Sequence, residues 1–230
     1  MEERYTIDGS DATPVKACVE KAVDFLESIA AGHPVSVACK GRESTGVRGA
    51  TFTLPKQREA LRKGISERWG AKNLYYSLNA VDPSAPLSGR AGRLKEADVA
   101  FVRGVAVDLD PRHGRDLEEE RERLVALTDE QLSHPSDPPS FVIDSGGGVQ
   151  MLWIFEEPLK ADQATASAVK AQAQALEGRF GSDSISNLDR LLRLPFTMNF
   201  PGKAKRYCRE NLDSFKVPVK ITVVEYSQHT

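Results

Sequence analysis

The sequence contains little cysteine and no long apolar run. Its three cysteines, Cys18, Cys39 and Cys208, lie far apart and in no CxxC spacing, which argues against a disulfide framework and against a zinc site. No apolar run approaches the roughly 18 residues that a membrane span needs, and the first residues of the chain are polar. We therefore expect a cytoplasmic protein that has no membrane partner.

The chain also lacks an excess of positive charge. Its 31 Lys and Arg residues are balanced by 33 Asp and Glu residues, which gives a net charge of -2. No global positive field therefore favours nucleic acid, so any such contact would depend on local basic patches. The 230 residues allow one large domain or two small ones, with enough chain to bury a core.

Apolar spacing and turn residues predict alternating helices and strands. Helices are expected over residues 13–31, 56–69, 116–132 and 160–177. Strands are expected over residues 35–40, 50–54, 73–81, 105–109, 141–144, 149–155 and 215–226. The charged run at residues 118–123 is interpreted as a solvated helix face.

The most informative stretch is residues 105–111, an apolar run that ends in Asp108 and Asp110. Alternate side chains of a strand face opposite sides, so both carboxylates share one face with Ala106. Two like charges this close repel unless a proton or a cation lies between them, and Mg²⁺ or Mn²⁺ is the usual partner. The alternative is a strand that ends in an Asp-Pro turn without a metal.

Two loops have residues suited to phosphate. Ser145 and the three glycines after it join two predicted strands, where exposed amides and the hydroxyl could hold phosphate oxygens. The alternative is a hairpin whose geometry alone requires glycine. Upstream, Arg90 and Arg93 follow a loop rich in proline and serine and could clamp phosphates through their guanidinium groups. The alternative there is a solvated basic loop.

A further polar segment lies between residues 180 and 199. It contains Asp183, Asp189 and Arg193, and a basic stretch with Lys203, Lys205 and Arg206 follows it. The alternative interpretation is a short capped amphipathic helix followed by solvated basic residues.

Taken in order, these segments resemble the archaeo-eukaryotic primase superfamily, specifically the primase-polymerase domains of phages, plasmids and integrated elements. The strand ending in Asp108-Leu109-Asp110 is similar to the family's first motif, and residues 145–150 are similar to its second. Asp183 together with residues 193–199 is similar to the third. The resemblance covers residues 73–206 and is weak over the first third of the chain.

The resemblance implies a fold and a set of site residues. The fold is α+β, with an N-terminal α/β unit over about residues 1–100 joined to an RRM-like unit over about residues 101–230, built on mixed or antiparallel sheets. Asp108, Asp110 and Asp183 would hold two divalent ions, Mg²⁺ or Mn²⁺. The residues expected to contact the nucleotide are Arg90, Arg93, Ser145, Gly147, Gln150, Arg193 and Asn199.

The implied function is that of a DNA primase and DNA-directed polymerase in phage or mobile-element replication. Its partners would be a single-stranded DNA template, nucleoside triphosphates and a possible helicase domain or protein. Lys203, Lys205 and Arg206 would bind the template, with strong salt dependence. The physics is consistent, because phosphate transfer needs paired metals and positive donors around the leaving group.

Two departures from the family pattern leave alternatives open. Gln150 stands where the family usually has His, and an amide can donate a hydrogen bond but cannot become a cation. Asp189 also precedes Arg193, although the family spacing favours Asp183. A non-catalytic module that binds single-stranded DNA or an origin is therefore the alternative function. A third class is another DxD metalloenzyme, either a phosphohydrolase or a sugar-nucleotide transferase. The phosphohydrolase is disfavoured, because Pro111 and Arg112 follow Asp110 where that class has other residues.

Overall fold

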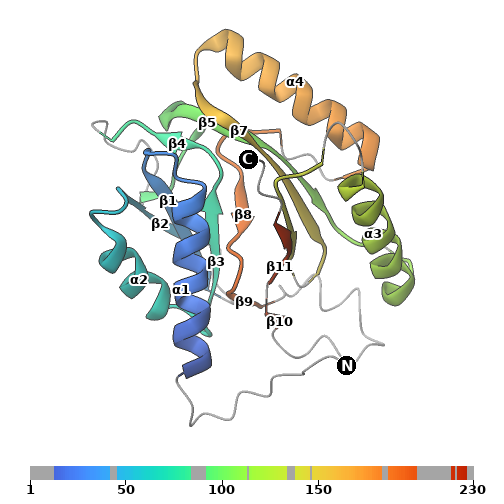
Figure 1. Ribbon diagram of the computed structural model, residues 1–230, viewed down its shortest axis with the longest axis horizontal. Helices are drawn as coiled ribbons and strands as arrows, with labels where there is room; N and C mark the ends of the chain where they lie inside the picture. Colours follow the sequence, from blue (N-terminus) through green and yellow to red (C-terminus); the bar gives the residue numbers. More distant parts are fainter. Residues whose placement is uncertain are drawn as a thin grey trace.

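Two large antiparallel sheets and four α-helices make up the part of the chain that the computed structural model describes (Figure 1). This part comprises residues 13–41, 46–83, 92–112, 114–133, 138–145, 147–182, 186–200, 219–220 and 222–226. The predicted α+β class with antiparallel sheets is confirmed. Among the described helices, none combines the length and apolar character that crossing a bilayer requires.

The first sheet has the strand order β2-β1-β3-β8, and every neighbouring pair is antiparallel. Its strands are β1 (Val35–Gly41), β2 (Val47–Phe52), β3 (Lys72–Ser77) and β8 (Leu191–Arg193). Helices α1 (Thr13–Ser28) and α2 (Arg58–Ser66) pack on this sheet. Because β8 pairs with β3, residues near position 192 complete a sheet that is otherwise built from the first third of the chain.

The second sheet has the order β11-β6-β7-β5-β4. Its strands are β4 (Ala80–Val81), β5 (Val99–Leu109), β6 (Phe141–Asp144), β7 (Val149–Lys160) and β11 (Thr222–Tyr226). Helices α3 (Leu117–Leu132) and α4 (Gln163–Phe180) cover its outer side, as Figure 1 shows. Asp116 and Asp162 cap these two helices by accepting hydrogen bonds from backbone amides of their first turns.

Residues 186–200 form turns and two short strands, where an amphipathic helix was the alternative. Beyond β8, the short strand β9 (Met198–Asn199) pairs with β10 (Val219–Lys220). A tight turn joins β8 to β9, in which the Thr197 hydroxyl donates to the Leu194 carbonyl oxygen at 2.7 Å. Arg193 and Asn199 of this segment therefore lie on strands.

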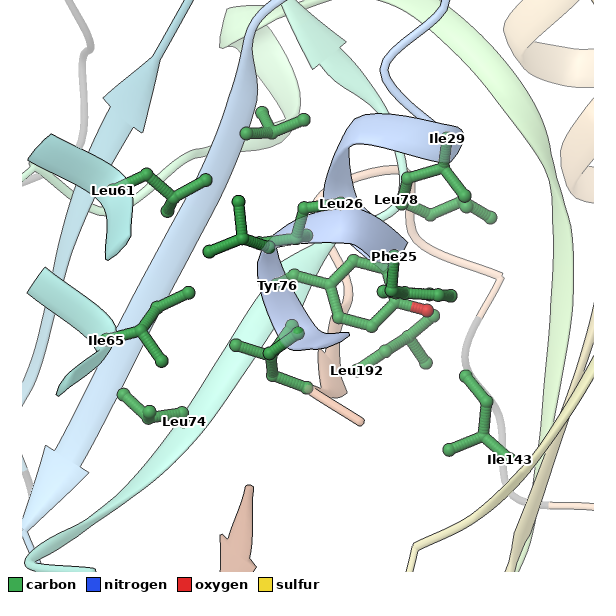
Figure 2. Packing of buried hydrophobic residues seen from close by; sticks show 14 of the residues in the cluster. Phe25, Leu26, Ile29, Leu61, Ile65, Leu74, Tyr76, Leu78, Ile143 and Leu192 are labelled. Carbon is green, nitrogen blue, oxygen red and sulfur yellow. The ribbon is translucent and has the colours of Figure 1, made fainter. Parts of the chain in front are cut away.

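The core consists of two clusters that lie on opposite faces of the second sheet. Val105, Val107 and Leu109 pack with α3 and α4 in one cluster. Ala106 belongs to the other cluster, which also contains Tyr76 and the side chains drawn in Figure 2 from α1, α2 and the first sheet. The predicted alternation along β5 is confirmed, and Asp108 continues the Ala106 face.

Arg103 joins the two parts of the fold. This side chain on β5 is only 1% exposed and donates to the carbonyl oxygens of Ala30, His33, Pro34 and Leu78 at 2.7–3.2 Å. Burial lowers the pKa of Arg103 to about 10, so the group remains a cation at neutral pH. A helix end leaves carbonyl oxygens without partners, and Arg103 supplies donors to those that follow α1.

Candidate active site

The candidate site begins where β5 ends. Asp108 lies directly opposite Gln150 of β7 in the antiparallel ladder, and the Gln150 Nε2 atom is 3.5 Å from Asp108 Oδ1, the outer limit of a hydrogen bond. Gln150 is 1% exposed, and its Oε1 atom has no hydrogen-bond partner among the described residues. The amide therefore faces the carboxylate from within the protein, where it has almost no access to solvent.

Gly148 allows the second carboxylate to come close to β7. A Cβ built on Gly148 would overlap the carbonyl oxygen of Leu109 and would lie 3.0 Å from Asp110 Oδ1. Any other residue would force the two strands apart at this point. Gly148 thus sets the distance between the acidic end of β5 and the turn that begins at Ser145.

Glu120 holds the chain that follows Asp110. Its carboxylate accepts hydrogen bonds from the Arg112 backbone amide at 2.9 Å and from the guanidinium groups of Arg112 and Arg123 at 2.6–3.0 Å. These hydrogen bonds lower the pKa of Glu120 to about 2. The prediction that the charged run of α3 is a solvated face is wrong for Glu120, which is 2% exposed because it fixes this loop.

The turn of residues 145–148 is closed by its own hydrogen bonds. The Ser145 hydroxyl donates to the Gly148 carbonyl oxygen at 3.0 Å and accepts from the Gly148 amide at 3.1 Å. Asn199 of β9 donates from Nδ2 to the Ser145 carbonyl oxygen at 2.7 Å and lies beside Gly147. The hydroxyl proton of Ser145 is thus committed to the turn, and Asn199 ties the turn to the third segment.

Arg193 brings positive charge toward the acids. Its guanidinium carbon lies 4.5 Å from the centre of the Tyr75 ring, a cation-π distance. Burial lowers the pKa of Arg193, while the ionised form of Tyr75 and the carboxylates of Asp108 and Asp110 act in the opposite direction. Its Nη1 atom is buried and has no hydrogen-bond partner among the described residues, so one donor within the site is unsatisfied.

Tyr76 approaches Asp108 from the first sheet. The side chain is fully buried, and its ring meets Phe25 edge-on at 5.2 Å (Figure 2). Burial raises the pKa of the Tyr76 hydroxyl well above its usual value, and the negative charge of Asp108 raises it further. Sequence reasoning gave no role to Tyr75, Tyr76 or Glu120. For the two tyrosines, the sequence signal was their adjacent positions within one predicted strand. Adjacent side chains of a strand face opposite sides, so the two rings must contact different parts of the protein.

The structure brings together most of the described residues that the sequence proposes for the site. Around the end of β5 it gathers Asp108, Asp110, Ser145, Gly147, Gln150, Arg193 and Asn199. Arg93 lies next to Gly92, which packs against Gly49 of β2. Asp189 lies on the turn before β8. The predicted residues Arg90, Asp183, Lys203, Lys205 and Arg206 lie outside the described residues.

The arrangement suits a divalent ion held by two carboxylates. Asp108 and Asp110 present oxygen ligands on one side of the β5 end, and hard divalent ions prefer such ligands. Within the described ranges, no group of three or more acidic, His or Cys side chains is placed to hold a metal. Two protein carboxylates with further oxygens from a substrate are a usual set for Mg²⁺, so the residues fit the ion.

With the geometry in place, the fold can be compared with known proteins. No protein-family model matches the chain, and no curated protein matches it by sequence. The fold is of the type found in a primase. It is similar to the crystal structure of primase RepB', with a TM-score of 0.51 and 11% identity over 90% of this chain and 56% of that chain. The chain therefore spans little more than half of that protein's length.

A second structure shows a similar relation. The crystal structure of the catalytic domain of primase RepB' in complex with initiator DNA aligns with a TM-score of 0.48 and 12% identity, over 90% of this chain and 85% of that chain. At such low identity, the first of these similarities shows the fold alone. The expected primase-type fold is supported, and the chemistry must be argued from the site.

Proposed function

We propose that this protein is a primase-polymerase, which transfers nucleotides from nucleoside triphosphates onto a strand templated by single-stranded DNA. The observation that carries the proposal is the convergence of Asp108 and Asp110 with Arg193 and with the turn of residues 145–148. These groups come from separate parts of the chain, and the proposal is further supported by a fold similar to that of primase RepB'.

The proposed role of each site residue follows from its charge. Asp108 and Asp110 would hold the two divalent ions, with Asp183 as the proposed third carboxylate. When bound, Mg²⁺ or Mn²⁺ lowers the pKa of the attacking hydroxyl and neutralises charge on the pyrophosphate leaving group. Arg193, fixed on Tyr75, offers its unpaired Nη1 atom to the triphosphate. The Gly147 backbone amide is a further candidate donor, whereas the Ser145 hydroxyl and the Gly148 amide are used within the turn.

The test is nucleotide incorporation with single-stranded templates, triphosphates and Mg²⁺ or Mn²⁺. Asp108→Asn should lower the rate by about 100-fold or more, because the ion supplies several kcal/mol of charge stabilisation. Asp144→Asn is the matched control, since Asp144 is a neighbouring acid that faces α3 and pairs with Arg121 at 2.9 Å. Equal activity of Asp108→Asn and the wild type would remove the catalytic assignment.

Gln150 favours a second candidate, a module that binds single-stranded DNA or an origin without catalysis. A buried neutral amide beside Asp108 adds no cation for the triphosphate. This candidate requires that the wild type incorporates no nucleotide on any template. It also requires that an Asp108→Asn and Asp110→Asn double variant binds DNA as tightly as the wild type, because phosphate contacts alone would then give the affinity.

A further inference from the structure

A second concave surface lies away from Asp108, between α2 and strands β1, β2 and β3. It is an open groove of about 470 Å³. In the antiparallel register Cys39 stands opposite both Arg48 and Leu74, so the groove lies on the face of the sheet that carries α2. The residues that line the groove include none of those gathered around the end of β5. The groove is therefore separate from the candidate active site.

The rim of the groove is basic. Arg48, Lys63, Arg68 and Lys72 line it, together with a single acid, Glu67. Arg68 is fixed by hydrogen bonds to the Gly64 carbonyl oxygen at 2.8 Å and to Glu67 at 3.3 Å. Within the described part of the chain, no carboxylate forms an ion pair with the other three cations. A chain of net charge -2 thus concentrates positive charge at one groove.

The floor of the groove is apolar. Its accessible apolar residues are Val37 of β1 and Ala50 and Phe52 of β2. Leu61, Ile65 and Leu74 also line the groove, but they are only 0–1% exposed and belong to the core. A ligand that matches this surface needs flat apolar parts for the floor and negative charges at a regular distance for the rim. Nucleic-acid bases and phosphates have this combination, and in a duplex the bases are stacked away from such a floor.

We propose that this groove binds single-stranded nucleic acid, with bases against the apolar floor and phosphates against the basic rim. The argument for this occupant is charge complementarity together with an aromatic ring in the floor, since stacking on aromatic side chains tolerates any base. The identification of the strand as the template rests on the proposed function. The binding itself requires neither a divalent ion nor a nucleoside triphosphate.

The first experiment measures the binding of a fluorescent 20-nucleotide oligothymidylate by anisotropy at several salt concentrations, without metal or nucleotide. A variant with Arg48→Gln, Lys63→Gln and Lys72→Gln should bind roughly tenfold more weakly at low salt. Its slope of log K against log salt should fall by about 2, because each lost phosphate contact removes about 0.7 from the slope. Glu67→Gln should tighten binding, since it removes the one acid of the rim.

The matched control is a variant with Lys16→Gln, Lys56→Gln and Lys160→Gln, three exposed lysines outside the groove. It loses the same charge and should keep the affinity within about twofold of the wild type. Equal affinities and slopes for the two triple variants would overturn the proposal. Thermal melting of both variants checks that the fold is retained.

A second readout places the strand directly. A photocrosslinker on Lys63→Cys should attach to the oligothymidylate, whereas the same group on Lys56→Cys should not. Absence of a crosslink at Lys63→Cys together with a crosslink at Lys56→Cys would overturn the proposal. Failure of the proposed function would appear differently, as a wild type that binds DNA through the groove but incorporates no nucleotide.

Discussion

The side-chain amide of Gln150 faces the carboxylate of Asp108 across the β5–β7 ladder, at 3.5 Å between Nε2 and Oδ1. Because Gln150 is 1% exposed, its partner is the acid itself, and a triphosphate in solvent could reach it only by displacing that contact. The residue that departs from the family pattern therefore orients a carboxylate. Removing the amide tests this interpretation.

Gln150→Met is expected to lower metal-dependent nucleotide incorporation by about tenfold, because a hydrogen bond to a charged group contributes about 1.5–3 kcal/mol. The free energy of unfolding should change by less than about 1 kcal/mol, since the variant also removes the Oε1 atom that has no partner. Steady-state incorporation and urea unfolding measure the two effects.

The control for this variant is Gln131→Met, which replaces an equally buried amide on α3. Its effect should fall on stability, with kcat unchanged for the folded protein. If Gln150→Met behaves in the same way, then the amide is a structural group with no part in orienting Asp108.

Local patterns predicted β5 and its two faces because the side-chain period of a strand is set by the backbone alone. The pairing of Tyr75 with Arg193 was not predictable, since β8 has only three residues and pairs with a strand more than a hundred positions earlier. The burial of Glu120 depends on where Arg112 and Arg123 lie in space. In the sequence, Glu120 looks like its exposed neighbours on α3.

Gly148→Ala is expected to destabilise the fold and the site together. The new Cβ would overlap the Leu109 carbonyl oxygen, so β5 and β7 must separate beside Asp110, at a cost of about 1–3 kcal/mol. Thermal unfolding measures the loss of stability. Gly147→Ala is the matched control for stability, because its Cβ would meet only Asn199 Nδ2, at 3.8 Å. Equal stabilities of the two variants would contradict the close approach at Gly148.

Arg193→Lys is expected to weaken nucleoside triphosphate binding by about tenfold. An ammonium group lacks the planar fork that contacts phosphate in two places and stacks on Tyr75. The dissociation constant for a triphosphate in the presence of Mg²⁺ measures the effect. Arg190→Lys, an exposed arginine on the same segment, should leave this constant unchanged. Equal losses in both variants would show that the guanidinium group of Arg193 makes no specific contact with the triphosphate.

Acid stability is expected to depend on Glu120. The Arg112 and Arg123 hydrogen bonds lower the pKa of Glu120 from 4.5 to about 2 in the folded protein. Between pH 4.5 and pH 2 the unfolded chain therefore binds a proton that the folded chain does not, so stability falls as the pH falls through this window. The contribution of the ionised group is fully present above this window.

Glu120→Gln should consequently melt at a lower temperature than the wild type at pH 7, and this difference should shrink as the pH approaches 2. Glu122→Gln, on the exposed side of α3, is the matched control for the loss of one carboxylate. A difference in melting temperature that stays constant from pH 7 to pH 2.5 would show that the ionised form of Glu120 is not what holds Arg112. Neutral hydrogen bonding and packing would then hold the loop after Asp110, because the amide of Gln can still accept a hydrogen bond from the Arg112 backbone.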